Sequence, residues 1–188
     1  MNLDSAWQHL LDLWHLHPVG QTIGLVASAG YIIAALQQDD RKLFGIQLCG
    51  ALCFALHYFL LGAWAGVGGY SVGAARNITV LFRLATPSRR LSLTLLFCSL
   101  YGAIAFYTYH QWPDLIPPLC GAITAIAFFN LRGFQMRVLQ MSAQGLFIAY
   151  ALYVGSIGGL ITAVVELSFT LFTVTRLLRA ETSMPQAP

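Results

Sequence analysis

Residues 44–84, FGIQLCGALCFALHYFLLGAWAGVGGYSVGAARNITVLFRL, align without a gap with residues 137–177, RVLQMSAQGLFIAYALYVGSIGGLITAVVELSFTLFTVTRL, at an offset of 93 positions. Identical residues occupy corresponding places in corresponding apolar runs: Gln47 and Gln140, Phe54 and Phe147, Gly62 and Gly155, Gly66 and Gly159, Arg83 and Arg176, Leu84 and Leu177. Internal duplication of apolar segments is a common signature of membrane transport folds, whose substrate site lies between the two copies. The alignment therefore predicts a duplicated membrane fold.

The composition is that of an integral membrane protein. Hydrophobic residues make up 57% of the chain and charged residues 9%, against roughly 25% charged residues in an ordinary soluble domain. Seven apolar runs approach the roughly 20 residues that cross a bilayer as a helix, and they cover residues 19–36, 43–61, 65–84, 91–109, 115–129, 138–154 and 157–178. We therefore expect an all-α fold of seven transmembrane helices, of which the fifth is the shortest.

Basic residues orient these helices. Nine of the ten Lys and Arg residues lie around alternate links or after the last run: Arg41, Lys42, Arg83, Arg89, Arg90, Arg132, Arg137, Arg176 and Arg179. Because basic residues collect on the cytoplasmic side, we expect the N-terminus outside and the C-terminus in the cytoplasm. Arg76 is the exception, since it lies inside an apolar run.

The runs group as three helices, one helix and three helices. We expect an outer-leaflet amphipathic segment at 1–18, a first three-helix repeat at 19–84, a linker helix at 85–110, a second three-helix repeat at 111–178 and a disordered cytoplasmic tail at 179–188. The single linking helix lets both repeats enter the membrane in the same orientation. The repeats are then parallel, related by an axis along the membrane normal.

Several function classes lack support in the sequence. No basic stretch with interleaved aromatic residues indicates nucleic-acid binding. The sequence also lacks the features that would indicate an enzyme, such as paired carboxylates or a nucleophile beside a base. The expected partners are the lipid bilayer and a small polar or charged solute, with no cofactor, and self-association into a homo-oligomer stays open.

One stretch resembles a known family. The run QLCGALCFALHYFLLG at residues 47–62, with Arg76 and the GSIGG at residues 155–159, resembles the bacterial inner-membrane YgjV-type family over roughly residues 19–180. The three-one-three layout is similar to the SWEET and PQ-loop group of small-solute transporters, which implies a central cavity lined by the third and seventh helices. The sequence departs from that group because no Pro-Gln pair ends the first helix and Pro117-Pro118 begins the fifth, so a sugar substrate is not implied.

Arg76 and Glu166 are the charges that the membrane interior must accommodate. Each lies about ten or eleven residues into its run, where a charge costs roughly 2.5–3.5 kcal/mol or more. At the 93-residue offset Arg76 corresponds to Phe169, one helical turn from Glu166, so the two charges occupy equivalent faces of equivalent helices. We hypothesise that they meet, or jointly line a central cavity with Asn77 adjacent. An ion pair that only orients the bundle is the structural alternative.

Two matched glutamines are candidates for a gate. Gln47 and Gln140 correspond to each other near the cytoplasmic ends of the second and sixth helices. Amide side chains can bond across helices inside a membrane. The pair therefore forms either a symmetric inner gate or a structural bond between neighbouring helices.

His57 is a candidate for a relay or, with two cysteines, for a metal site. It follows Cys53 by four residues and Cys49 by eight, on one helix stripe, and two thiolates with an imidazole can bind Cu(I) or Zn. The repeat argues against metal, because the positions that match these three hold Ser142, Leu146 and Tyr150. His57 otherwise forms a local hydrogen bond or relays a proton.

The sequence favours a transporter of a small polar or charged solute in the bacterial inner membrane, working by alternating access about Arg76, Asn77 and Glu166. A non-transporting membrane scaffold or accessory subunit is the first alternative, and a metal-handling membrane protein is the second. A transporter requires a polar cavity near the midplane, whereas a scaffold predicts a filled core. Metal handling predicts thiol and imidazole atoms within coordination distance of one another.

Overall fold

The computed structural model describes residues 12–35, 37, 40–82, 84–131 and 133–182, and this part of the chain contains helices and no β-strand. Helices α2 to α8 follow in chain order as Pro18–Ala35, Asp40–Leu60, Trp64–Leu81, Arg90–Thr108, Ile116–Asn130, Gly133–Val154 and Ile157–Thr182, with short 3-10 helices at Pro87–Arg89 and Trp112–Leu115. Each of the helices α2 to α8 coincides with one of the apolar runs.

The two predicted terminal segments, 1–18 and 179–188, are only partly described. Within the predicted amphipathic segment 1–18, residues 12–16 are helical and residues 1–11 lie outside the described residues. The tail was predicted to begin at residue 179, but α8 continues to Thr182. The helix extends because Arg179, Ala180 and Glu181 are good helix formers. Residues 183–188 lie outside the described part.

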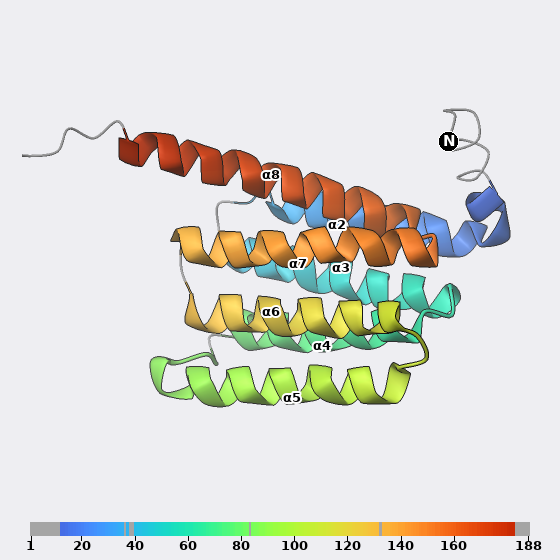
Figure 1. The fold of residues 1–188 in the computed structure, drawn as a ribbon, viewed down its shortest axis with the longest axis horizontal. Helices are drawn as coiled ribbons and strands as arrows, with labels where there is room; N and C mark the ends of the chain where they lie inside the picture. The colour runs from blue at the N-terminus through green and yellow to red at the C-terminus, as the bar shows by residue number, and fades with distance from the viewer. Residues whose placement is uncertain (1–11, 36, 38–39, 83, 132, 183–188) are drawn as a thin grey trace, which may run out of the picture.

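Successive helices run in opposite directions, so their connections alternate between two ends (Figure 1). The α3–α4 and α7–α8 turns lie at the end that also holds the start of α2, and we call it the glycine-turn end. The α4–α5 link, with Arg89 and Arg90, and the start of α3, with Lys42, lie at the opposite end, which we call the basic end. Basic residues therefore separate from the glycine turns along the helix direction.

The helices form two packed sets that touch along two seams. α3 packs between α2 and α4, and α7 packs between α6 and α8. The sets meet where α2 contacts α8 and where α4 contacts α6. α5 lies at the edge against α4 and α6 (Figure 1). The centre of the molecule is thus enclosed by helices from both sets.

Aromatic side chains fill the centre between α3 and α7. Phe54 and Tyr58 from α3 pack with Phe147 and Tyr150 from α7 in one buried cluster. Tyr70 of α4 stacks on this cluster, with its ring centroid 4.8 Å from that of Phe54 and 5.5 Å from that of Tyr58. Such large rings bury much apolar area, so this cluster holds the two sets of helices together.

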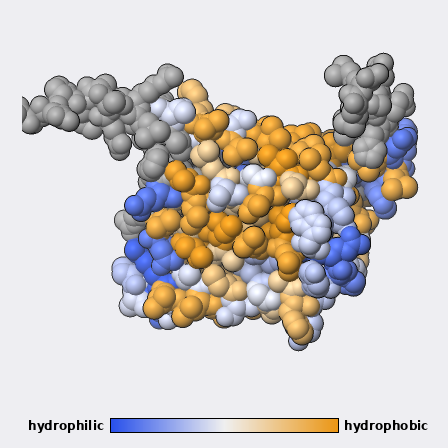
Figure 2. All heavy atoms as spheres, viewed as in Figure 1, coloured by the Kyte–Doolittle hydropathy of each residue, from blue (hydrophilic) through white to orange (hydrophobic). Residues whose placement is uncertain are grey.

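The outer surface is apolar between the two ends. Figure 2 shows orange apolar side chains across the middle of this face and blue hydrophilic residues toward both ends. By length and composition, Pro87–Thr108 and Trp112–Asn130 are able to cross a membrane, and shorter apolar stretches lie in α2, α3, α7 and α8. Phe106 and Tyr107 of α5 are each 80% exposed. An apolar belt of this kind fits contact with lipid.

The two glycine turns have the same geometry. Gly62 has φ 71° and Gly155 has φ 70°. After each glycine, the next amide donates to a carbonyl five residues back, from Ala63 to Tyr58 at 2.9 Å and from Ser156 to Ala151 at 2.9 Å. A left-handed residue that closes a helix in this way is commonly glycine. The sequence match between Gly62 and Gly155 therefore reflects one turn used twice.

Replacing Gly62 with alanine forces a side chain into the left-handed region, which should lower the free energy of unfolding by about 1–2 kcal/mol. No atom lies within 4 Å of an added Cβ there, so the substitution isolates backbone strain. Gly145→Ala in α7 is the matched control, because its added Cβ also meets nothing within 4 Å, and it should be neutral or stabilise by up to about 1 kcal/mol. Thermal unfolding in detergent, followed by circular dichroism, measures both. Equal effects of the two substitutions would contradict the assignment.

Candidate functional site

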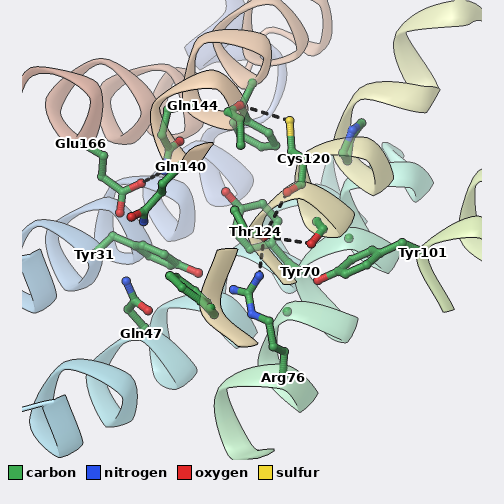
Figure 3. Close-up of a pocket in the computed structure, with 17 residues that line it drawn as sticks. Tyr31, Gln47, Tyr70, Arg76, Tyr101, Cys120, Thr124, Gln140, Gln144 and Glu166 are labelled. Atoms are coloured by element: carbon green, nitrogen blue, oxygen red, sulfur yellow. Dashed lines mark hydrogen bonds between the residues drawn. The ribbon is translucent and has the colours of Figure 1, made fainter. Parts of the chain in front are cut away.

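A cavity of about 100 Å³ lies between the two sets of helices. Every helix from α2 to α8 contributes to its lining. Its polar side chains are Tyr31, Gln47, Tyr70, Arg76, Tyr101, Thr124, Gln140, Gln144 and Glu166 (Figure 3). A polar cavity enclosed by otherwise apolar helices is the default candidate for a binding site.

Arg76 is held in the cavity wall by neutral groups. It is the thirteenth of the 18 residues of α4 and is 8% exposed. Its Nη1 donates to the hydroxyl of Thr124, and its Nη2 donates to Asn77 Oδ1 at 3.4 Å. Its guanidinium carbon also lies 4.7 Å from the centroid of the Phe128 ring, which stabilises a desolvated cation. The Nε has no hydrogen-bond partner among the described residues.

The hydroxyl of Thr124 connects Arg76 to the backbone of α6. It accepts a hydrogen bond from Arg76. Its proton is directed at two backbone carbonyl oxygens, that of Cys120 at 3.0 Å and that of Gly121 at 2.9 Å. A Thr hydroxyl can donate once and accept, so this arrangement uses both capacities. Thr124 therefore fixes the position of the guanidinium against α6.

Glu166 faces the same cavity from α8. It is 8% exposed, and its Oε2 accepts from the side-chain amide of Gln144 on α7. No ion pair joins Arg76 to Glu166 among the described residues, because the hydrogen bonds of each charge go to neutral side chains. Two opposite charges thus line one cavity without contacting each other. In a low-dielectric interior each remains available to a charged group placed between them.

Other polar groups in the wall also lack partners. Gln47, Gln140 and the hydroxyls of Tyr31, Tyr70 and Tyr101 line the cavity and make no hydrogen bond within the described part of the chain. Buried polar groups are usually paired with protein or water. The cavity therefore has unused hydrogen-bonding capacity directed at its contents.

Comparison with known proteins places this fold in a family. A family model described as "Bacterial inner membrane protein" matches residues 18–181. The chain belongs to the Imp-YgjV family. It is 24% identical over 161 residues to the inner membrane protein YgjV of Escherichia coli (strain K12), which covers 86% of this chain and 84% of that protein. No solved structure gives a significant match, so the resemblance to SWEET and PQ-loop transporters finds no support there.

This member of the Imp-YgjV family is therefore a protein of the bacterial inner membrane, as the sequence predicted. Of the site residues predicted from the sequence, Arg76, Glu166, Gln47 and Gln140 line one cavity. Gln47 and Gln140 are each the eighth residue of their helix, α3 and α7, so their matched register places both amides at the same depth. That a solute binds among them remains a prediction.

Asn77 does not line the cavity, contrary to prediction. Successive residues of a helix point about 100° apart, so Asn77 cannot face the same way as Arg76. It is fully buried, and its side-chain oxygen accepts from Arg76. Asn77 therefore supports Arg76 from beside the cavity, and its own Nδ2 has no partner in the described part of the chain.

His57 also lies away from the cavity, in a buried network at the glycine-turn end. Its Nδ1 lies 2.7 Å from the carbonyl oxygen of Gly20, and its Nε2 lies 2.7 Å from Ser156 Oγ. A carbonyl oxygen only accepts, so Nδ1 carries the proton, and in the neutral ring Nε2 accepts from Ser156. Of the two non-metal roles predicted for His57, a local hydrogen bond or a proton relay, the structure shows hydrogen bonds, which join α3 to Gly20 and to Ser156 before α8.

The structure does not form the predicted metal site at Cys49, Cys53 and His57. Both ring nitrogens of His57 are engaged elsewhere, and Cys49 is exposed. Among the described residues, no group of three His, Cys, Asp or Glu side chains is placed to hold a metal ion. The prediction rested on the shared helix stripe of these residues, but α2 packs against His57 with the backbone of Gly20 and Gly24.

Sequence reasoning missed Tyr31, Thr124 and Gln144. Two signals could have found them. Gln144 lies one helical turn after Gln140, on the same face, and Tyr31 corresponds to Thr124 at the 93-residue offset. Both residues line the cavity, although the aligned pair changes from tyrosine to threonine.

Thr124→Val removes the hydroxyl that binds Arg76 and keeps the shape of the side chain. A hydrogen bond to a charged group contributes about 1.5–3 kcal/mol, so the free energy of unfolding should fall by about that amount. Thr22→Val is the control, because Thr22 is exposed and its hydroxyl donates to the carbonyl of Pro18 in its own helix at 2.8 Å. Thermal unfolding of both variants decides the matter. A Thr124→Val protein as stable as the control would show that Arg76 does not depend on this contact.

Proposed function

We propose that this protein moves a small polar or charged solute across the bacterial inner membrane by alternating access. The observation that carries the proposal is a cavity, lined by all of the helices α2 to α8, that holds Arg76 and Glu166 apart. Each intramembrane charge costs roughly 2.5–3.5 kcal/mol or more, and such residues are functional candidates by default. A solute that binds between the charges gives a reason to keep both.

The depth of the two charges supports this reading. At about 1.5 Å per residue, Glu166 lies roughly 15 Å and Arg76 roughly 20 Å from the glycine-turn starts of α8 and α4. The hydrocarbon core is about 30 Å thick. If helices α2 to α8 all cross the membrane, both charges fall near its middle.

The packing of the helices favours two parallel repeats joined by α5. If α2, α3 and α4 correspond to α6, α7 and α8, then the contact of α2 with α8 corresponds to a contact of α6 with α4. Both contacts occur. The two left-handed glycine turns also correspond. Repeats related by an axis along the membrane normal can rock against each other about a site between them. The positions of Lys42, Arg89 and Arg90 favour placing the basic end in the cytoplasm.

The cavity also favours transport over a scaffold. A scaffold needs a filled core and an apolar contact surface, whereas this core leaves Gln47, Gln140 and three tyrosine hydroxyls facing a cavity without partners within the described chain. Their retention is better explained by a polar solute or water that enters.

Contacts at the glycine-turn end connect the two sets of helices, and a transporter must break them to open there. Gln21 of α2 donates to the Gly155 carbonyl at 2.7 Å and accepts from the Ile157 amide at 3.1 Å. His57 bonds Ser156, as described above. We call Gln21, His57 and Ser156 the outer latch. The Tyr150 hydroxyl of α7, which accepts from the Gly66 amide of α4 at 3.0 Å, makes a similar link on the other seam.

Transport is tested with purified protein in liposomes and a panel of labelled amino acids, sugars, organic acids and cations. We expect at least one panel solute to enter faster than in protein-free liposomes. Arg76→Gln should reduce that rate at least about tenfold, because loss of one buried charged partner costs roughly 2–5 kcal/mol. Arg89→Gln is the matched control, because Arg89 is exposed at the basic end. A folded protein that moves no panel solute, or an Arg76→Gln protein with the wild-type rate, would refute the proposal.

The outer latch is tested by the reactivity of Cys120, which lines the cavity and is 8% exposed. With Cys49, Cys53 and Cys98 replaced by serine, a membrane-impermeant thiol reagent is added from outside. Ser156→Ala removes a bond of about 1–1.5 kcal/mol from the closed state, so Cys120 should react roughly five- to tenfold faster.

Ser168→Ala is the control for this measurement, because the hydroxyl of Ser168 bonds the Val164 carbonyl of its own helix, α8. It should leave the reaction rate of Cys120 unchanged. Equal rates in the Ser156→Ala and Ser168→Ala proteins would show that the latch does not hold the glycine-turn end closed.

A further inference from the structure

The two charges of the cavity lie on different sides of it. Figure 3 shows Arg76 with Thr124 and the Tyr101 hydroxyl on one side, and Glu166 with Gln140 and Gln144 on the other. Each charge is held by neutral hydrogen-bond partners, Thr124 and Asn77 for the cation and Gln144 for the carboxylate. The cavity therefore offers one position for an anionic group and a separate position for a cationic group.

We propose that the cavity binds a small zwitterion, with the carboxylate of the solute at Arg76 and its ammonium group at Glu166. The inference rests on the proposed function, since it takes the cavity to be the solute site. A zwitterion satisfies both charges and adds no net charge to a low-dielectric interior. A lone anion is repelled by Glu166, a lone cation is repelled by Arg76, and a neutral solute leaves both unpaired.

The hydrogen-bonding groups match the two ends of such a solute. A guanidinium presents five donors in a planar fork that suits a carboxylate, and the Tyr101 hydroxyl on the same side has no partner within the described residues. An ammonium group has three donors and no acceptor. Glu166 and the amide oxygen of Gln140 supply acceptors on the other side.

The size of the cavity restricts the class further. Its volume of about 100 Å³ is well below the roughly 300–1,000 Å³ of pockets for drug-sized ligands. Small zwitterions such as glycine and alanine are therefore the members of the class to test first.

The first experiment uses the wild-type protein in detergent and three probes of similar size. Alanine carries both charged groups, propionate lacks the amine and ethylamine lacks the carboxylate. At matched concentrations, alanine or glycine should raise the midpoint of thermal unfolding, because a ligand of the folded state stabilises it by mass action. Propionate and ethylamine should bind at least about tenfold more weakly. No shift with either zwitterion, or an equal shift with propionate or ethylamine, overturns the inference.

The second experiment reverses the selectivity. Glu166→Gln leaves Arg76 as the lone charge, so this variant should lose alanine binding and bind propionate more tightly than the wild type does. Arg76→Gln should lose alanine binding and gain ethylamine binding. Arg89→Gln should keep the wild-type preference. If the two charges were purely structural, neither variant would gain binding of propionate or ethylamine. Variants that lose stability and show neither gain therefore count against the inference. If one variant does not fold, the other still decides.

The two proposals fail separately. If the liposome panel reveals transport of a sugar, an organic anion or a cation while alanine and glycine do not bind, transport stands and the zwitterion is excluded. If alanine binds with the reversed selectivity but no panel solute crosses the membrane, the site stands and transport is excluded.

Discussion

A guanidinium cannot be left unpaired in the interior of a membrane, and the centre of this protein is arranged around that requirement at Arg76. The chain supplies a hydroxyl from Thr124, an amide oxygen from Asn77 and the face of Phe128. None of these partners is charged. An acidic partner in direct contact would have neutralised the guanidinium and left an inert pair. With neutral partners the cation is held in place and retains its charge toward the cavity.

The carboxylate follows the same rule on the opposite helix set, and here the repeat becomes informative. At the 93-residue offset Glu166 corresponds to Gly73, and Arg76 corresponds to Phe169. Gly73 lines the cavity, and an added Cβ there would lie 3.8 Å from the Tyr101 hydroxyl, whereas Phe169 is 43% exposed. The two copies share their turns and seams but differ at the charged positions. Each charge therefore has an uncharged residue at the corresponding position, so the cavity has a positive side and a negative side.

The sequence predicted the helices because apolar runs of spanning length leave the backbone few alternatives in lipid. It predicted Arg76 and Glu166 because a deep charge is costly wherever it points. It could not predict that they would be separated, since separation depends on the side chains of Thr124 and Gln144 from two other helices. The role of His57 stayed open for the same reason: a helix stripe shows which residues share a face, but the partners of that face, here Gly20 and Ser156, come from packing.

In the proposed alternating access, the two sets of helices move against each other at the two seams. At one seam, Gly158 of α8 lies so close to the backbone of Gly24 in α2 that a side chain would not fit, and Ser28 donates to the Gly158 carbonyl at 2.6 Å. At the other seam, an added Cβ on Gly69 of α4 would meet Pro117 of α6 at 3.2 Å. Gly24 and Pro117 are equivalent positions of the repeat at the 93-residue offset. One close contact thus lies at each seam. In the proposed alternating access, movement at these two contacts breaks the bonds of the outer latch at the glycine-turn end.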